Sequence, residues 1–171
     1  EQHIRREKAT SNICTAQVLL GVMAGMYGVY HGPAGLRQIA SQVNGKAKLA
    51  EAGLKSLGLN QLNEVYFDTL RIEMSSEEAT QLKTLAEEQE INFRYFANGN
   101  VGISVDEATL LEDVQDILSV FAQAKGTDLN FDVFEEAINI DVSIEGRLNR
   151  TSDFMTHPVF NQYQSEHEML R

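Results

Sequence analysis

Residues 67–74 have the sequence Phe-Asp-Thr-Leu-Arg-Ile-Glu-Met, and they set the fold class. Leu70, Ile72 and Met74 alternate with polar side chains, and this period of two predicts a strand with one buried face. The Ser-Ser-Glu-Glu stretch that follows supplies serine caps and first-turn acids, so a helix is expected to run to about residue 90. A half-buried strand followed directly by a capped helix is typical of a sheet with helices on its buried face.

Downstream of this helix, the pattern predicts a β-hairpin and another helix. Residues 91–96 and 101–105 have the composition of strands, and they flank Asn-Gly-Asn at 98–100, which is a turn signal. A long helix is expected to begin at Asp106 or the residue after it. Gly126 is expected to end that helix, because glycine readily takes the left-handed conformation that follows a helix.

Upstream of the first strand, two long helices are predicted, one over residues 12–30 and the other over 33–57. His31-Gly32-Pro33 separates them, since glycine suits the end of one helix and proline suits the first turn of the next. The first helix is apolar nearly all round, which predicts a helix buried by something outside this chain. The chain itself is then expected to self-associate or to expose an apolar patch. Asn44-Gly45 is expected to kink or interrupt the second helix, and Gly58 is expected to end it.

Together these elements predict an α+β fold, with helices on one side of a small, mostly antiparallel sheet. We expect three parts: bridging helices at 1–58, a small β-α-β-β-α domain at 59–140, and an irregular connection at 141–171. A short helix is expected within 130–140. The final residues, Glu-His-Glu-Met-Leu-Arg, have the pattern of a helix that continues beyond Arg171.

Composition narrows the class of protein. The chain has 171 residues, 43% of them hydrophobic, enough for the core of one globular domain. Its formal net charge is −11, so nucleic acid is not an expected partner, because phosphate binding needs clustered cations. No apolar run approaches the roughly 18 residues of a membrane span, and the charged start does not resemble a signal peptide. One cysteine and four scattered histidines indicate neither an internal disulfide nor a metal site.

The residues that carry candidate chemistry gather before and at the start of the first helix. Arg5, Arg6 and Lys8 either hold an anion at the helix N-terminus or form an ordinary solvated stretch. Asn12 is a good capping residue, and Cys14 follows in the first turn, where the helix dipole favours the thiolate. The alternative for Cys14 is an inert core residue. No lysine has a context that indicates a Schiff base, so these residues alone leave the role of the domain open.

A resemblance to a known family begins in the same region. Residues 1–17, Glu-Gln-His-Ile-Arg-Arg-Glu-Lys-Ala-Thr-Ser-Asn-Ile-Cys-Thr-Ala-Gln, closely resemble a motif of the glycine cleavage system P-protein, glycine dehydrogenase (decarboxylating). The resemblance continues in Met-Tyr-Gly-Val-Tyr-His-Gly-Pro at 26–33 and Val-Gly-Ile-Ser-Val-Asp-Glu at 101–107. It reappears in Thr-His-Pro-Val-Phe-Asn at 156–161, so it covers nearly the whole chain in order.

The resemblance implies where this chain belongs in a longer enzyme. That enzyme would have two halves, each resembling a fold-type I pyridoxal-phosphate enzyme, and only the second half would carry the cofactor lysine, beyond Arg171. This chain resembles the C-terminal part of the first half, including its small domain, so no catalytic or cofactor-binding residue is expected in it. Its implied role is structural and channel-shaping. The channel or interface candidates are Arg5, Lys8, Asn12, Cys14 and Thr15.

The resemblance also implies a reaction and its partners. The whole enzyme, an oxidoreductase of glycine catabolism, would decarboxylate glycine with pyridoxal phosphate and pass the aminomethyl group to the lipoyl H-protein. The partners implied for this chain are the cofactor-carrying half and a second copy in a homo-oligomer, and the isolated chain is expected to be inactive. The compartment would be the cytoplasm of a bacterium or the mitochondrial matrix of a eukaryote. The alternative is a free-standing binding or scaffold protein on the same fold.

Overall fold

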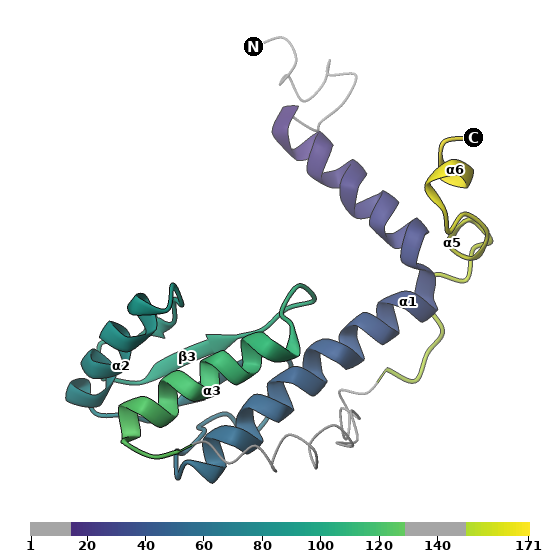
Figure 1. The fold of residues 1–171 in the computed structure, drawn as a ribbon. Helices are drawn as coiled ribbons and strands as arrows, with labels where there is room; N and C mark the ends of the chain where they lie inside the picture. Colours follow the sequence, from purple (N-terminus) through teal and green to yellow (C-terminus); the bar gives the residue numbers. More distant parts are fainter. Residues whose placement is uncertain (1–14, 129–149) are drawn as a thin grey trace, which may run out of the picture. The chain divides into compact units, whose positions relative to one another are not determined.

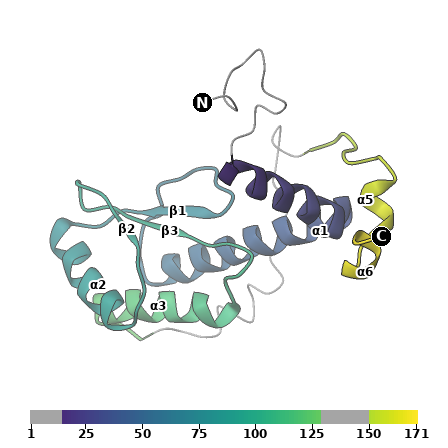
Figure 2. The same cartoon turned by 90° about the horizontal axis from the view of Figure 1, so that it is seen from above.

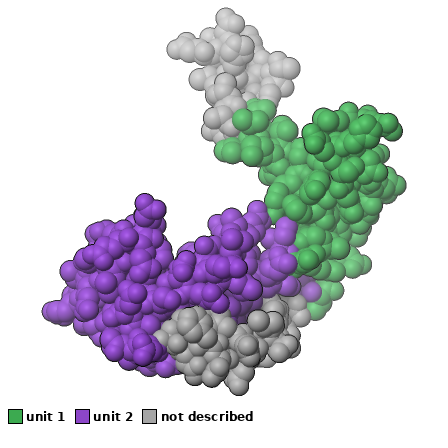
Figure 3. Space-filling model, in the orientation of Figure 1, with its two compact units in different colours: residues 1–38, 151–171 green, residues 39–150 purple. Residues whose placement is uncertain are grey.

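The computed structural model describes residues 15–128 and 150–171 (Figures 1 and 2). The chain forms two compact units, which Figure 3 colours separately. Unit 1 comprises Glu1–Gln38 and Thr151–Arg171, and unit 2 comprises Ile39–Arg150. The units meet in sequence after residue 38, whereas the division expected from the sequence falls at 58/59. The second expected boundary, at 140/141, lies outside the described residues, and the three-part division stays a prediction.

The helix α1, Thr15–Ser56, contains the predicted break between two helices. Gly32 has φ 60° and ψ −178°, a non-helical conformation that favours glycine, and Pro33 begins the next turn. The predicted interruption at Asn44-Gly45 is wrong, because α1 is helical through both residues. Asn44 is only 2% exposed, and its side-chain Nδ2 donates a 2.7 Å hydrogen bond to the carbonyl of Phe67. This long-range bond ties the helix to the chain before the sheet.

The sheet of unit 2 has three antiparallel strands in the order β1-β3-β2. The strands are β1 (Thr69–Ile72), β2 (Arg94–Tyr95) and β3 (Val101–Ser104), and Leu70 lies opposite Ile103. The pairing of β2 with β3 confirms the predicted hairpin. Each strand is shorter than predicted. The strand β2 has only two residues, because only Arg94 and Tyr95 pair with β3.

Two capped helices complete unit 2. The helix α2, Ser76–Glu88, begins at a capping box, in which the hydroxyl of Ser75 accepts from the N–H of Glu78 and the Glu78 carboxylate accepts from the N–H of Ser75. The helix α3, Leu111–Lys125, starts later than predicted. The carboxylate of Asp106 accepts bonds of 2.9 Å from the N–H groups of the two residues at 108 and 109, so it organises a turn before the helix.

The core of unit 2 lies between one face of the sheet and three helical segments. In Figure 2, α2 and α3 lie on the same side of the strands. The second part of α1 contributes to the same cluster of buried side chains. The large side chains that are essentially inaccessible to solvent are Leu54, Leu70, Ile72, Leu82, Val101, Ile103, Val114, Leu118, Val120 and Phe121. The fold is therefore α+β with helices on one face of a small antiparallel sheet, as predicted, while the likeness to a domain of pyridoxal-phosphate enzymes stays a prediction.

The C-terminal part of unit 1 contains two short helices, α5 (Val159–Gln162) and α6 (Glu166–Met169). The short helix expected within 130–140 lies outside the described residues. Among the described helices, none combines the length and the apolar character that crossing a membrane would require.

Candidate functional site

The first half of α1 carries a largely exposed apolar surface. Between Thr15 and Leu36 the sequence has no lysine, arginine, aspartate or glutamate. The most exposed of its apolar residues are Leu19 and Leu20, each 64% exposed. The large exposed apolar side chains of this half are Val18, Leu19, Leu20, Val22, Met23, Met26, Tyr27 and Tyr30, which we call the α1 apolar face. A helix that is apolar nearly all round needs cover on every side, and within this chain the helix is not covered. The expectation that this helix exposes apolar surface in the present chain is confirmed.

Within unit 1, the C-terminal segment packs on α1 at its bend. A side chain at Gly32 would place its Cβ 2.5 Å from the carbonyl oxygen of Phe160, so only glycine permits this approach. At Gly28, one turn earlier, the corresponding Cβ would lie 3.3 Å from the terminal methyl of Met155. On the other side of the bend, the guanidinium of Arg37 lies 5.0 Å from the centre of a phenyl ring in the C-terminal segment, that of Phe154. Gly28 and Gly32 therefore allow the C-terminal segment to approach α1 closely.

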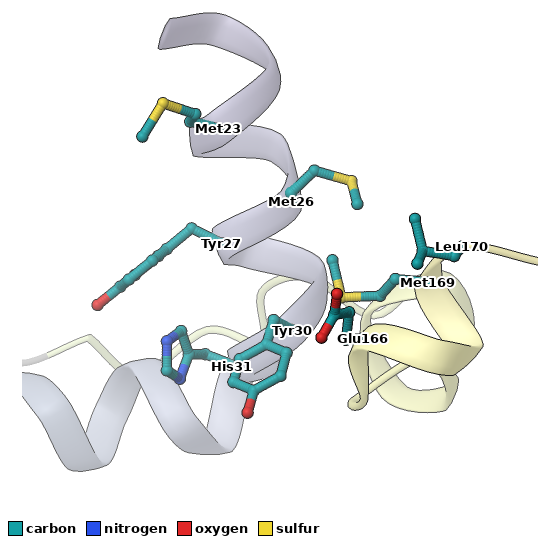
Figure 4. Close-up of a pocket in the computed structure, with 8 residues that line it drawn as sticks. All are labelled: Met23, Met26, Tyr27, Tyr30, His31, Glu166, Met169 and Leu170. Atoms are coloured by element: carbon teal, nitrogen blue, oxygen red, sulfur yellow. The ribbon is translucent and has the colours of Figure 1, made fainter. Parts of the chain in front are cut away.

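An apolar groove lies between this half of α1 and the end of the chain (Figure 4). Its volume is about 370 Å³. The lining residues are Met23, Met26, Tyr27, Tyr30, His31, Glu166, Met169 and Leu170. The centre of the His31 ring lies 4.4 Å from the centre of the Tyr27 ring and 5.0 Å from that of the Tyr30 ring. These aromatic contacts keep the imidazole beside the groove. Three flexible methionines in a mostly apolar lining suit contact with another apolar surface better than recognition of a charged substrate.

The residues that the sequence suggested as channel or interface candidates lie at the start of the chain, almost all of them outside the described residues. Arg5, Lys8, Asn12 and Cys14 lie outside the described residues, and Thr15 is the first residue of α1, with no description of its side chain. Their roles stay predictions.

The perturbed ionisable groups of unit 2 hold its elements together. The hydroxyl of Tyr66 donates a 2.6 Å bond to the carboxylate of Glu51, and burial together with this carboxylate raises the pKa of the phenol. The hydroxyl of Thr109 is the main cause that lowers the pKa of the exposed Asp106 carboxyl. The amine of Lys46 donates to the carbonyl of Asp106 at 3.2 Å, so α1 is also fastened to the turn before α3. These contacts are structural, and no group of three or more potential metal ligands occurs in the part of the chain that is described.

Two arginines on the sheet were missed by the sequence analysis. Arg71 of β1 and Arg94 of β2 both lie opposite Gly102 of β3, on the face of the sheet away from the helices. The signal was present as an arginine at an outward position of each of two strands, but their convergence depends on the strand order.

An α+β domain preceded by a helix with an exposed apolar face is typical of a protein part that associates with another polypeptide. Comparison with known families identifies the family to which this chain belongs. The family model for the glycine cleavage system P-protein matches residues 1–121. The chain belongs to the glycine cleavage system P-protein family, as its sequence motifs predicted. This is a family of pyridoxal-phosphate-dependent glycine decarboxylases.

Four of the described lysines have carboxylate or carbonyl partners. Neither the groove of unit 1 nor a second cavity of about 420 Å³ in unit 2 is lined by a lysine. Lys55, Lys83 and Lys125 each lie within 4 Å of a glutamate carboxylate, and Lys46 donates to backbone carbonyls.

Proposed function

We propose that this chain serves a glycine cleavage P-protein as part of the half that does not hold the cofactor, and that the α1 apolar face packs against the cofactor-carrying half. The observation that carries the proposal is the exposure of eight large apolar side chains along one charge-free helix segment. Burying a Leu, Val or Met side chain fully is worth about 1.5–3 kcal/mol, so covering this face supplies a substantial driving force for association.

In the proposed enzyme, pyridoxal phosphate, when bound to the other half, supplies the electron sink for loss of carbon dioxide from glycine. The residues of this chain shape the channel and exclude water from it. The lipoyl H-protein is the proposed acceptor of the aminomethyl group and so a partner of the whole enzyme. The lysine that binds the cofactor is proposed to lie outside this chain, which agrees with the position of the described lysines.

The proposed contact is tested with two pairs of neighbouring leucines. Leu19→Ser with Leu20→Ser changes the α1 apolar face, and Leu110→Ser with Leu111→Ser changes a control pair at the start of α3 that is 59% and 48% exposed. Only the first pair should weaken binding to a separately produced cofactor half and reduce glycine decarboxylation by the mixture. Binding is measured by sedimentation velocity, and release of labelled carbon dioxide measures the reaction. Equal effects of both pairs would contradict the proposed interface.

The isolated chain provides a second test, which also distinguishes the scaffold alternative. It should bind an environment-sensitive apolar dye or self-associate, and neither property should persist once the cofactor half is bound. Incubation with pyridoxal phosphate, borohydride reduction and mass analysis should label no single lysine specifically. Specific labelling of one lysine would place the cofactor in this chain. A clean monomer without dye binding would favour a free-standing binding or scaffold protein.

Asn12, Cys14 and Thr15 are proposed to face the substrate channel of the whole enzyme, and Arg5 and Lys8 are proposed to lie at that channel or at an interface. A capped helix start offers unpaired N–H groups to a carboxylate, and the preceding cations add positive potential. The same environment favours the thiolate of Cys14. Cys14 should therefore react with a thiol reagent faster than a model thiol at neutral pH. Labelling that requires denaturant would show a buried core residue and remove the support for the channel.

A further inference from the structure

The side chains of Arg71, Arg94 and Phe96 form a compact cluster in unit 2, on the face of the sheet away from the helices. Arg71, Gly102 and Arg94 lie in one cross-strand row, since residues directly opposite in antiparallel strands share a face. Phe96 lies two residues after Arg94. A Cβ on Gly102 would lie 3.2 Å from the phenyl Cε2 of Phe96, so this ring covers the glycine.

The guanidinium groups of both arginines lie close to the phenyl ring of Phe96. The guanidinium carbon of Arg71 lies 4.5 Å from the centre of the Phe96 ring, and that of Arg94 lies 5.5 Å from it. Contact with an aromatic face orients a guanidinium but leaves most of its in-plane N–H groups available as donors. The Nε atom of Arg71 is buried and has no hydrogen-bond partner among residues 15–128 and 150–171. The cluster is thus a pre-oriented set of N–H donors rather than a pair of loose surface chains.

The charge around this cluster makes its two arginines unusual. Residues 59–128 contain fourteen acidic and four basic residues. Both lysines of this segment lie near a carboxylate, Lys83 near Glu87 and Lys125 near Glu78, whereas neither arginine lies within 4 Å of one in the described chain. The carboxylate of Glu73, the residue after β1, accepts a hydrogen bond from the side-chain amide of residue 60.

We infer that the cluster of Arg71, Phe96 and Arg94 is a docking site for an acidic segment of a partner protein. Two guanidinium forks bind carboxylates in a bidentate manner, and the charge of such a segment complements the cluster. In an extended peptide, alternate side chains lie about 7 Å apart on one face, so two carboxylates of one short segment can reach both arginines. A nucleic acid fits less well, because two cations within an acidic surface offer few phosphate contacts. This inference goes beyond the proposed function and does not depend on it.

Two double variants with the same change in net charge test the site. Arg71→Gln with Arg94→Gln removes both guanidinium groups, and Lys83→Gln with Lys125→Gln removes the two paired cations of the same segment. The probe is a fluorescein-labelled hexaglutamate peptide, added to the full chain at low salt and followed by fluorescence anisotropy. The arginine variant should weaken binding by at least about tenfold, and the lysine variant by less than about twofold, because only the former removes the donor cluster.

Two further measurements guard against loss of folding and against another ligand. Arg94 is exposed, so Arg94→Gln alone should keep the wild-type circular dichroism spectrum and still weaken binding about fivefold. Equal weakening by the arginine and lysine double variants would overturn the inference. So would the absence of saturable binding up to about 1 mM peptide. Tighter binding of a labelled uridine hexanucleotide than of hexaglutamate would also overturn it, in favour of a nucleic-acid site.

Discussion

Gly53 of α1 faces Leu118 of α3. Replacing this glycine with alanine should lower the free energy of unfolding of the wild type and raise that of a Leu118→Ala variant. A methyl group on residue 53 would lie 2.8 Å from one terminal methyl of Leu118, closer still to the other, and 3.1 Å from Cγ. Leu118 is 0% exposed and Gly53 is also buried. Protein cores are close-packed, so the leucine side chain would have to shift to accept this methyl group.

The size of the effect follows from two opposing contributions. Alanine is about 1 kcal/mol more favourable than glycine inside a helix, whereas overpacking a core costs about 1–3 kcal/mol. Gly53→Ala should therefore lower the free energy of unfolding of the wild type by about 0–2 kcal/mol. Leu118→Ala alone should lower it by about 2–5 kcal/mol. In that second background the overlap is gone, so Gly53→Ala should raise the free energy of unfolding by about 1 kcal/mol.

Urea unfolding of the full chain, followed by circular dichroism, measures both single variants and the double variant. Gly21→Ala is the matched control, because a Cβ at this helical position would have no neighbour within 4 Å. It should stabilise both backgrounds by a similar amount, through helix propensity alone. The reasoning about close packing at Gly53 is refuted if Gly53→Ala shifts both backgrounds in the same direction.

Two other substitutions have outcomes fixed by local contacts. The backbone N–H of Ser75, and after it the amine of Lys125, lower the pKa of Glu78 to about 2 from 4.5. The Glu78 carboxylate therefore stabilises the fold above pH 4.5, and this contribution is lost as the pH falls toward 2. Glu78→Gln should remove this dependence of the free energy of unfolding on pH. The change should be under about 1 kcal/mol, because the Glu78 side chain is 40% exposed. Urea midpoints measured at several pH values across that range test it. Gly32→Ala should loosen the C-terminal segment, because a methyl would approach the carbonyl of Phe160 at a left-handed φ. Limited proteolysis should then cleave that segment sooner than in the wild type, and equal rates would contradict the packing described at this bend.

Local sequence determined the features that depend on neighbouring residues. The serine and glutamate of the capping box at Ser75 and Glu78 lie three residues apart, so their hydrogen bonds form wherever that helix packs. The bend of α1 follows from Gly32 and the proline after it, and the hairpin from the turn at 98–100. The family was also evident in the sequence, because its motifs are contiguous stretches.

Tertiary structure decided what local pattern could not. The alternation of residues 67–74 gave the buried face of β1 but not the length of the strand, which pairing with β3 limits. The helix stays continuous at Asn44, whose amide bonds to a carbonyl 23 residues away. Whether an apolar helix is buried depends on what covers it, and the α1 apolar face remains largely exposed in this chain. Arg71 and Arg94 meet on one ring only because β3 pairs with both of their strands, and sequence periodicity gives the face of a residue but not its neighbours across a sheet.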